Sequence, residues 1–435
     1  MTNSVRSALA ACILGLVLPA LAAEEKAPSR EALEKAEVGA GVFSKMIGGK
    51  EWRVEPIAGT KNFKVTWGDE TVTWTPKPWQ PKELQEKGPR YYYESFADTP
   101  YPPINISMDE RTKQEGYDVM RGWSLVENGS TYLDWKGGFC FDIIAAGGGV
   151  RTRCGIEWKK TYVRPEHKAV YNSTDPPTLS KRFIVLTAPR TVRGVGFVTR
   201  VYDHPTKEQD NWLYLPSVRK VRRLATASKQ DYFAGTPLRN EDLPQVSPYN
   251  HNYKVERTAL FADPGPQIWG FGNSGWEKKE EFLDGIGCPH WVVETTPKEP
   301  NYWFAKKTSW VNMFIYGISL ETAYDEKGEV SRVTNYAHRP ADLIDPSYPR
   351  GYLIWTMVNA HDVRTGYRAT FWGAHHRKNV AWEESFFDTQ YSEEIFNPDL
   401  LPNEYTSTLE FGPNPPNWVK TPDPWPQEAD VITGP

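Results

Sequence analysis

The chain has 435 residues, with 51 basic and 55 acidic side chains and a formal net charge of −4. This mild acidity argues against nucleic acid as an electrostatic partner, and the length allows two domains or one large β domain. The 18 Trp, 22 Tyr and 18 Phe residues, together with 36 Pro and 33 Gly, favour many short strands joined by turns over long helices.

Residues 1–23 have the pattern of a secretory signal peptide. Arg6 supplies the positive start, residues 8–18 are apolar but too short to span a bilayer comfortably, and Ala20 and Ala22 give a small-x-small cleavage site. No later segment approaches 18 uninterrupted apolar residues, so no transmembrane segment is predicted in the mature chain. The chain is therefore predicted to be exported.

An alternative is that Cys12 becomes the lipidated N-terminus of an outer-membrane lipoprotein, because residues 9–12, LAAC, resemble a lipobox. However, the apolar segment continues from residue 13 to residue 18, whereas the apolar region of a leader precedes the cut. We therefore favour a signal peptide that is removed.

Residues 24–179 are predicted to form either a β-rich N-terminal extension or part of the same sheet as the rest of the chain. Residues 29–35 have the pattern of a short helix with a serine cap. The segment 63–74, FKVTWGDETVTW, alternates apolar and polar residues on both sides of a turn, which predicts a β-hairpin. The proline-rich segment 76–105 is predicted to run extended over the surface.

The cysteines of the mature chain are Cys140, Cys154 and Cys288. Cys140 and Cys154 flank a glycine-rich run at 145–149, which has the composition of a hairpin turn. Because an exported protein meets oxidising conditions, a disulfide between these two is our first choice. Cys288 is expected to be a buried thiol. The spacing does not resemble a zinc site, the histidines show no ligand spacing, and no metal or cofactor is predicted.

Strand signals become regular between residues 180 and 400. The segment RFIVLTAP at 182–189 is apolar and β-branched, and two later hairpins are predicted to turn at 325–328 and 362–366. Strands joined by short turns predict an antiparallel meander. The proline-rich tail, 401–435, is predicted to run extended.

The segment 211–224, NWLYLPSVRKVRRL, joins an aromatic strand to four basic residues. In a strand, Trp212 and Tyr214 share one face. If the strand continues past Pro216, the basic residues lie at the rim of a sheet, beside an apolar interior.

The same segment belongs to an ordered set of motifs. They are VRGVG at 192–196, WLYLP at 212–216, VRKVRRL at 218–224, GTPLRNEDL at 235–243, YNHNYKV at 249–255, YDEKGEV at 324–330 and WTMVNAHDVRTGYRATF at 355–371. This set resembles the bacterial domain-of-unknown-function family 1329, whose members are often labelled outer-membrane lipoprotein-sorting proteins. The resemblance covers residues 180–400 well and residues 40–180 loosely. The chain departs from many relatives at Thr236 and Pro237, where they carry a Ser-Asp pair, so the resemblance assigns this loop no role.

This family is similar in fold to the LolA and LolB carriers, half-open antiparallel β-barrels in which a curved sheet wraps around helices and encloses an apolar cavity for acyl chains. The resemblance implies a mainly β protein with one large curved antiparallel sheet over residues 180–400 and a few short helices. It also implies a periplasmic carrier for a lipid or another hydrophobic ligand. Relatives accompany export pumps and outer-membrane proteins, which are therefore candidate partners.

The predicted ligand-binding residues are Trp212, Tyr214, Arg219, Arg222 and Arg223. Acyl chains would be buried beside the aromatic strand, and arginines at the mouth would meet an anionic head group or a membrane surface. The alternative is a solvated basic edge strand that prevents aggregation between sheets.

Two other classes of function remain alternatives. A secreted glycan-active enzyme would need two facing carboxylates, for which the acidic pairs at 383–384 and 393–394 lie beside Trp382 and Tyr391. No convincing catalytic motif is present, so an enzyme is not our prediction. A structural adaptor of an outer-membrane protein or export pump would use the tail, 401–435.

Overall fold

The computed structural model of the chain describes residues 43–47, 50–60, 62–75, 115–127, 132–134, 139–162, 176–224, 229–242, 248–261, 288–313, 316–340, 353–373 and 396–401. The predictions for the signal peptide and Cys12, for the helix at 29–35, for the segment 76–105 and for nearly all of the tail lie outside these residues.

Most strands of the described residues form one antiparallel sheet of 14 strands. The strand order is β11-β10-β9-β8-β7-β6-β18-β17-β16-β15-β14-β13-β12, with β5 paired to β7. The bounds are β5 Tyr132–Asp134, β6 Phe139–Ile144, β7 Val150–Thr161, β8 Thr178–Ala188, β9 Gly196–Tyr202, β10 Asp210–Leu215, β11 Lys220–Arg223, β12 His251–Phe261, β13 Cys288–Pro297, β14 Lys306–Asn312, β15 Ile318–Tyr324, β16 Val330–Pro340, β17 Leu353–Asp362 and β18 Arg368–Gly373.

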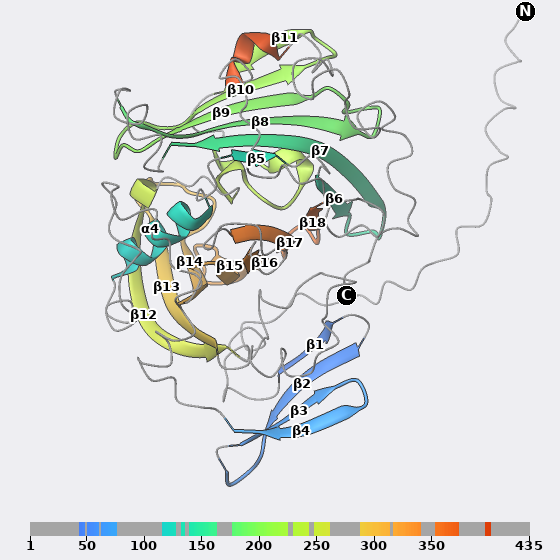
Figure 1. Cartoon of the computed structure of the whole chain (residues 1–435), viewed down its shortest axis with the longest axis vertical. Helices are drawn as coiled ribbons and strands as arrows, with labels where there is room; N and C mark the ends of the chain where they lie inside the picture. Colours follow the sequence, from blue (N-terminus) through green and yellow to red (C-terminus); the bar gives the residue numbers. More distant parts are fainter. Residues whose placement is uncertain are drawn as a thin grey trace, which may run out of the picture.

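The large sheet is curved and open. Figure 1 shows β7 to β11 on one side of the curl and β12 to β16 on the other, with α4 (Gly116–Glu127) between the two sides. The end strands β11 and β12 do not pair with each other in the described residues. The prediction of a mainly β protein with a large curved antiparallel sheet is therefore confirmed.

Residues 43–74 form a second sheet of four strands, in the order β1-β2-β3-β4. Its strands are β1 Phe43–Ile47, β2 Lys50–Pro56, β3 Phe63–Trp67 and β4 Glu70–Trp74. The predicted hairpin at 63–74 corresponds to β3 and β4 and is confirmed. Val54, Phe63 and Val65 are buried in this sheet. By contrast, β5, β6 and β7 belong to the large sheet.

Aspartates cap the two predicted late hairpin turns, which are confirmed. The carboxylate of Asp325 accepts hydrogen bonds from the backbone N–H groups of Lys327 and Glu329, both at 2.9 Å. Asp362 accepts from Arg364 and Thr365, both at 3.0 Å, in the turn between β17 and β18. In the turns, where backbone N–H groups have no partner on a neighbouring strand, these aspartate carboxylates accept their hydrogen bonds.

The strand at 211–215 does not continue past Pro216, so that expectation was wrong. The carbonyl oxygen of Leu215 accepts hydrogen bonds from the backbone N–H groups of Val218, at 3.1 Å, and Arg219, at 2.9 Å, which close a turn. Arg219 has φ +49°, in the left-handed region, and the chain returns as β11. The basic cluster therefore lies on a hairpin that folds back beside β10.

Helix α4 lies on the concave face of the sheet and was not predicted. It packs against β12, β13 and β17. Two glycines allow this close approach: a Cβ on Gly116 would lie 2.6 Å from the backbone of Tyr253, and one on Gly122 would lie 2.3 Å from the ring of Tyr316. On α4, Arg121 forms an ion pair at 2.8 Å with Asp203, next to β9, and so joins the two sides of the curl.

No helix among the described residues combines the length and the apolar character needed to cross a membrane.

Candidate functional site

A segment that we call the strap, residues 229–242, crosses the concave face of the large sheet. At one end its Phe233 ring lies 6.0 Å from Phe141 on β6 and 5.9 Å from Phe197 on β9, between ring centroids. The guanidinium of Arg153 on β7 donates to the carbonyl oxygen of Ala234. These contacts attach the strap to the β6–β9 side of the sheet.

The other end of the strap carries Asp242, which enters a buried ion cluster made of Asp242, Lys307, Glu321 and Arg332. Arg332 donates to both carboxylate oxygens of Asp242, one of them at 2.7 Å, and the ammonium of Lys307 lies 3.2 Å from the same carboxylate. Glu321 lies 3.1 Å from Lys307 and 3.2 Å from Arg332. The cluster attaches the strap to β14, β15 and β16.

Burial alone would raise the pKa of Asp242. Arg332 and Lys307 overcome that effect and hold the pKa of Asp242 well below its usual range. For Arg332, burial lowers the pKa, but the attraction to the Asp242 carboxylate outweighs burial and raises it. Asp242 and Arg332 are therefore both charged at neutral pH although each side chain is less than a tenth exposed.

The neighbouring residue, Glu241, has a different environment. Its carboxyl accepts hydrogen bonds from the hydroxyl of Tyr302 and the indole N–H of Trp303. Burial is the largest effect on Glu241 and raises its pKa, although Lys307 opposes this shift. Two adjacent acids of the strap thus have pKa values shifted in opposite directions, because arginine and lysine surround only one of them closely.

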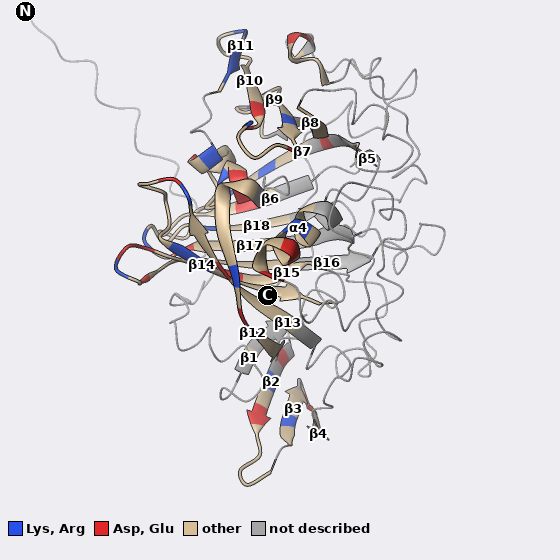
Figure 2. Cartoon of the chain, turned by 90° about the vertical axis from the view of Figure 1, so that its left-hand side faces the viewer, with Lys and Arg blue, Asp and Glu red and all other residues tan. Residues whose placement is uncertain are grey.

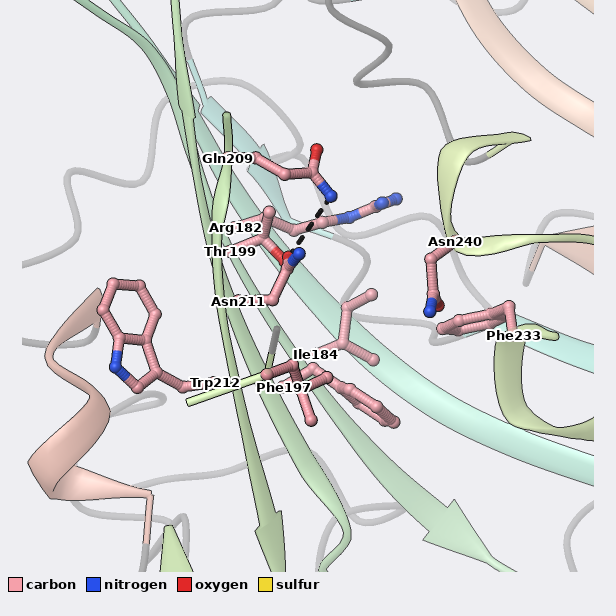
Figure 3. Close-up of a pocket in the computed structure, with 10 residues that line it drawn as sticks. Arg182, Ile184, Phe197, Thr199, Gln209, Asn211, Trp212, Phe233 and Asn240 are labelled. Atoms are coloured by element: carbon pink, nitrogen blue, oxygen red, sulfur yellow. Dashed lines mark hydrogen bonds between the residues drawn. The ribbon is translucent and has the colours of Figure 1, made fainter. Parts of the chain in front are cut away.

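A first pocket lies on the concave face between the strap and strands β8, β9 and β10, and we call it the β8–β10 pocket. It contains about 450 Å³ of empty space, part of it open to solvent. Figure 3 shows Ile184, Phe197 and Phe233 as apolar lining residues, with Gln209 and Asn211 beside them. The remaining lining residues are Arg182, Thr199, Trp212, Leu224 and Asn240.

A second pocket, the α4 pocket, lies between α4, the strap and strands β12 to β16, and contains about 370 Å³ of empty space, part of it open to solvent. Its lining residues are Met120, Trp123, Glu241, Asp242, His251, Tyr253, Thr295, Phe304, Lys307, Glu321 and Tyr336. The strap contributes to both pockets, and the two sets of lining residues do not overlap.

Of the predicted site residues, Trp212 and Tyr214 pack mainly on the other face of the sheet. They contact a core cluster made of Phe183, Val185, Val198, Phe396 and Leu401. Figure 3 shows the Trp212 ring on the opposite side of the strands from Ile184 and Phe197. Trp212 is nevertheless one of the residues that line the β8–β10 pocket.

The predicted arginines lie on one hairpin but not on one face. Arg222 pairs with Leu213 and so shares the face of Phe197, whereas Arg223 pairs with Trp212 on the other face. Arg223 also forms an ion pair with Asp210. Arg219 lies in the turn, and all three are exposed.

Strand β11 is the outermost strand on its side of the large sheet in the described residues. Figure 2 shows this strand largely in blue, the colour of Lys and Arg. Exposed cations on an outer strand oppose pairing with another chain, so the geometry also fits the alternative of a protective basic edge.

The residues of the ion cluster were missed. Asp242 and Lys307 look like ordinary surface charges in the sequence, and Arg332 lies in an alternating strand. The one available signal is the motif GTPLRNEDL at 235–243, which contains Asp242. A sequence motif does not reveal that its acid is buried, because the burial arises from strands that are distant in sequence.

Cys154 is buried and forms a disulfide bond. It lies directly opposite Cys140 in the register of β6 and β7, and the glycine-rich run between them is a hairpin turn with φ +83° at Gly148. The acidic pairs at 383–384 and 393–394 lie outside the described residues. Within the described part of the chain, no three His, Cys, Asp or Glu side chains are grouped so that they could hold a metal ion.

A family model described only as "Uncharacterized protein" matches residues 178–264. No curated protein matches. Among solved structures, the chain is similar to a protein described as an outer-membrane lipoprotein-sorting protein domain from Vibrio parahaemolyticus, with 18% identity, coverage of 66% of this chain and 98% of that chain, and a TM-score of 0.45.

The chain is also similar to a domain-of-unknown-function family 1329 protein from Desulfovibrio piger, with 18% identity, coverage of 65% of this chain and 98% of that chain, and a TM-score of 0.45. A LolA superfamily protein from Nitrosomonas europaea is similar as well, with 12% identity, coverage of 60% of this chain and 91% of that chain, and a TM-score of 0.38. The resemblance drawn from the sequence motifs is found again in these matches.

Proposed function

We propose that the chain is a periplasmic binding or carrier protein that holds a lipid or another hydrophobic ligand in the β8–β10 pocket. One observation carries the proposal: the concave face of an open, curved sheet has a pocket whose wall combines apolar and polar side chains.

The apolar wall of the pocket supplies the binding free energy. Ile184, Phe197 and Phe233 come from two strands and the strap and face the same space (Figure 3). Burial of each methylene of a ligand contributes about 0.8 kcal/mol, before the entropy of association is subtracted. Gln209 donates to Asn211 at 3.4 Å, and these two amides are placed to orient a polar group of the ligand.

The basic hairpin has a place in this proposal through Arg222. Arg222 shares the face of Leu213 and of the pocket residue Phe197, and it is exposed. We therefore assign to Arg222 the contact with an anionic head group or an acidic membrane surface. Arg223 lies on the other face beside Asp210, which partly neutralises it. Arg219, Trp212 and Tyr214 then support the hairpin rather than touch the ligand.

The proposed location has separate support. Disulfides form and persist in oxidising compartments, so the disulfide of Cys154 supports a location outside the cytoplasm, to which the predicted signal peptide would direct the chain. The register of β6 and β7 supports Cys140 as its partner. A link to envelope transport, with an outer-membrane or export-pump protein as partner, belongs to the proposal on the strength of the motif resemblance.

The test combines mass spectrometry with a fluorescent hydrophobic probe, N-phenyl-1-naphthylamine. Full-length protein purified without detergent is expected to release a bound lipid or similar molecule on extraction. Phe197→Asp is expected to weaken probe binding at least about tenfold, because a charge replaces an aromatic wall of the pocket.

The matched control is Val218→Asp, which adds the same charge at an exposed position in the hairpin turn and should leave probe binding unchanged. Leu224→Asp, at a half-buried lining position, repeats the test with less risk to folding. Probe affinities equal to wild type in both pocket variants, with circular dichroism showing a native fold, would refute the proposal.

A further inference from the structure

The α4 pocket contains three buried polar atoms that have no hydrogen-bond partner: the indole N–H of Trp123, the Nε2 atom of His251 and the hydroxyl of Thr295. Their side chains are 5%, 5% and 4% exposed. Buried polar groups are nearly always paired, with protein, water or a ligand. Three unpaired groups around one pocket therefore indicate a missing polar partner.

Rigid elements hold these three groups. Trp123 lies on α4, His251 begins β12, and Thr295 on β13 pairs in register with Tyr253, two residues beyond His251. The His251 ring stacks on Phe304 with centroids 5.6 Å apart and meets the edge of Tyr302 at 5.3 Å. The aromatic rings fix the orientation of the imidazole, so the site is built before any ligand arrives.

The charges near the pocket are already balanced. Asp242 and Glu321 offset Lys307 and Arg332 within the buried ion cluster. Burial raises the pKa of Glu241. Burial, with Lys307 nearby, lowers the pKa of His251 to about 3, so its imidazole is neutral. A ligand that brought a carboxylate or an ammonium would lose its hydration without finding an unengaged counter-charge.

The unpaired groups match an uncharged oxygen that both accepts and donates. An indole N–H only donates, a threonine hydroxyl does either, and a neutral imidazole nitrogen accepts or donates according to its tautomer. A hydroxyl group can satisfy two or three of them together. Met120 and Phe304 give the same pocket an apolar wall that suits a hydrocarbon chain.

We infer that the α4 pocket binds the hydroxyl head of an uncharged amphiphilic alcohol, through Trp123, His251 and Thr295. This site is distinct from the β8–β10 pocket, since no residue lines both. The inference goes beyond the proposed function and does not depend on it.

The test is isothermal titration calorimetry of the full-length protein at pH 7.5 with octan-1-ol, octanoate and octylamine, which share a chain and differ in the head group. Octan-1-ol is expected to bind at least about tenfold more tightly than either charged probe. Thr295→Val keeps the shape of the side chain and removes the hydroxyl, so it should weaken octan-1-ol about fivefold. His251→Phe, which preserves the ring stack, should have a similar effect.

The matched control is Thr322→Val. Thr322 is also fully buried with an unpaired hydroxyl, but it pairs with Val333 on the other face of the sheet and does not line the pocket. It should bind octan-1-ol within about twofold of wild type. Phe197→Asp, in the β8–β10 pocket, should not abolish the octan-1-ol binding that Thr295→Val weakens, which separates the two sites.

Three results would each overturn the inference: wild-type affinity for octan-1-ol in both Thr295→Val and His251→Phe; octanoate or octylamine bound as tightly as the alcohol; or loss of octan-1-ol binding in Phe197→Asp alone. The last result would assign the alcohol to the β8–β10 pocket and would leave the proposed function standing.

Discussion

Two groups of cations lie in different halves of the large sheet and have opposite environments. On the β10–β11 hairpin, four basic residues between 219 and 223 are exposed, and one of them, Arg223, pairs with Asp210. On β14 and β16, Lys307 and Arg332 are buried and share Asp242 and Glu321. The dense group is conspicuous in the sequence, whereas the buried pair is not.

The difference shows that the density of charges in the sequence does not predict how much they contribute to the stability of the fold. Exposed ion pairs contribute little to stability, because water screens them. Buried ion pairs cost desolvation to form, but removal of one partner leaves an uncompensated charge and is strongly destabilising. The buried group therefore holds the strap against the sheet, and the exposed group is available for a ligand, a membrane or protection of the edge.

The largest expected effect follows from Arg332→Met. The substitution keeps an unbranched apolar stem but removes the guanidinium, and leaves Asp242 and Glu321 with only Lys307 of this cluster to balance them. We expect the free energy of unfolding in urea to fall by about 3–5 kcal/mol. Arg222→Met, the same change on the exposed hairpin, should leave the urea midpoint unchanged. Equal effects of the two substitutions would remove the distinction between the two groups.

The second expected effect is a dependence of the unfolding free energy on pH, which arises from the buried His251 near Lys307. The pKa of His251 falls from an ordinary value of 6.5 to about 3 in the folded protein, because burial disfavours the charged imidazole. Between pH 6.5 and about pH 3 the unfolded chain binds a proton that the folded chain does not, so acid lowers stability by up to about 1.4 kcal/mol per pH unit.

His251→Phe removes this titration and should flatten the decline of the unfolding free energy between pH 6.5 and pH 4. Urea unfolding of wild type and variant at half-unit pH steps measures the difference. A variant whose stability falls with the wild-type slope would show that His251 is not responsible.

The smallest effect concerns the two faces of the hairpin. Arg222→Glu should weaken binding to vesicles with an acidic phospholipid about thirtyfold, since each basic residue near such a surface contributes about 1 kcal/mol and reversal doubles the change. Arg223→Glu, on the other face and beside Asp210, should have a clearly smaller effect. Sedimentation with vesicles at low and high salt measures both. Equal losses would favour a diffuse basic edge over a head-group contact by Arg222.

Sequence reasoning worked where the signal is local. The hairpin turns at Asp325 and Asp362 were predictable because an aspartate and a glycine a few residues apart determine the backbone there. The aromatic strand at 211–215 was predictable because its own aromatic and apolar residues favour an extended backbone. The direction of the chain after Pro216 was not, because a turn with Arg219 in the left-handed region has no strong sequence signature.

Helix α4 shows the limit of pattern reading most clearly. Gly116 and Gly122 lower its helical propensity, so the segment does not look like a stable helix. In the folded protein the same glycines let it approach the backbone of Tyr253 and the ring of Tyr316. Packing against the sheet stabilises a helix that its own residues would not form alone.

The sequence by itself determined a mainly β chain, the positions of several hairpins, and an aromatic strand next to a basic cluster, because alternation and turn residues act over a few positions. The tertiary structure alone decided that Asp242 meets Lys307 and Arg332, that Arg222 shares the face of the sheet that carries Phe197, and that Trp123, His251 and Thr295 surround one pocket. Those relations join residues far apart in the chain. They arise from the curvature and register of the large sheet, which no local segment encodes.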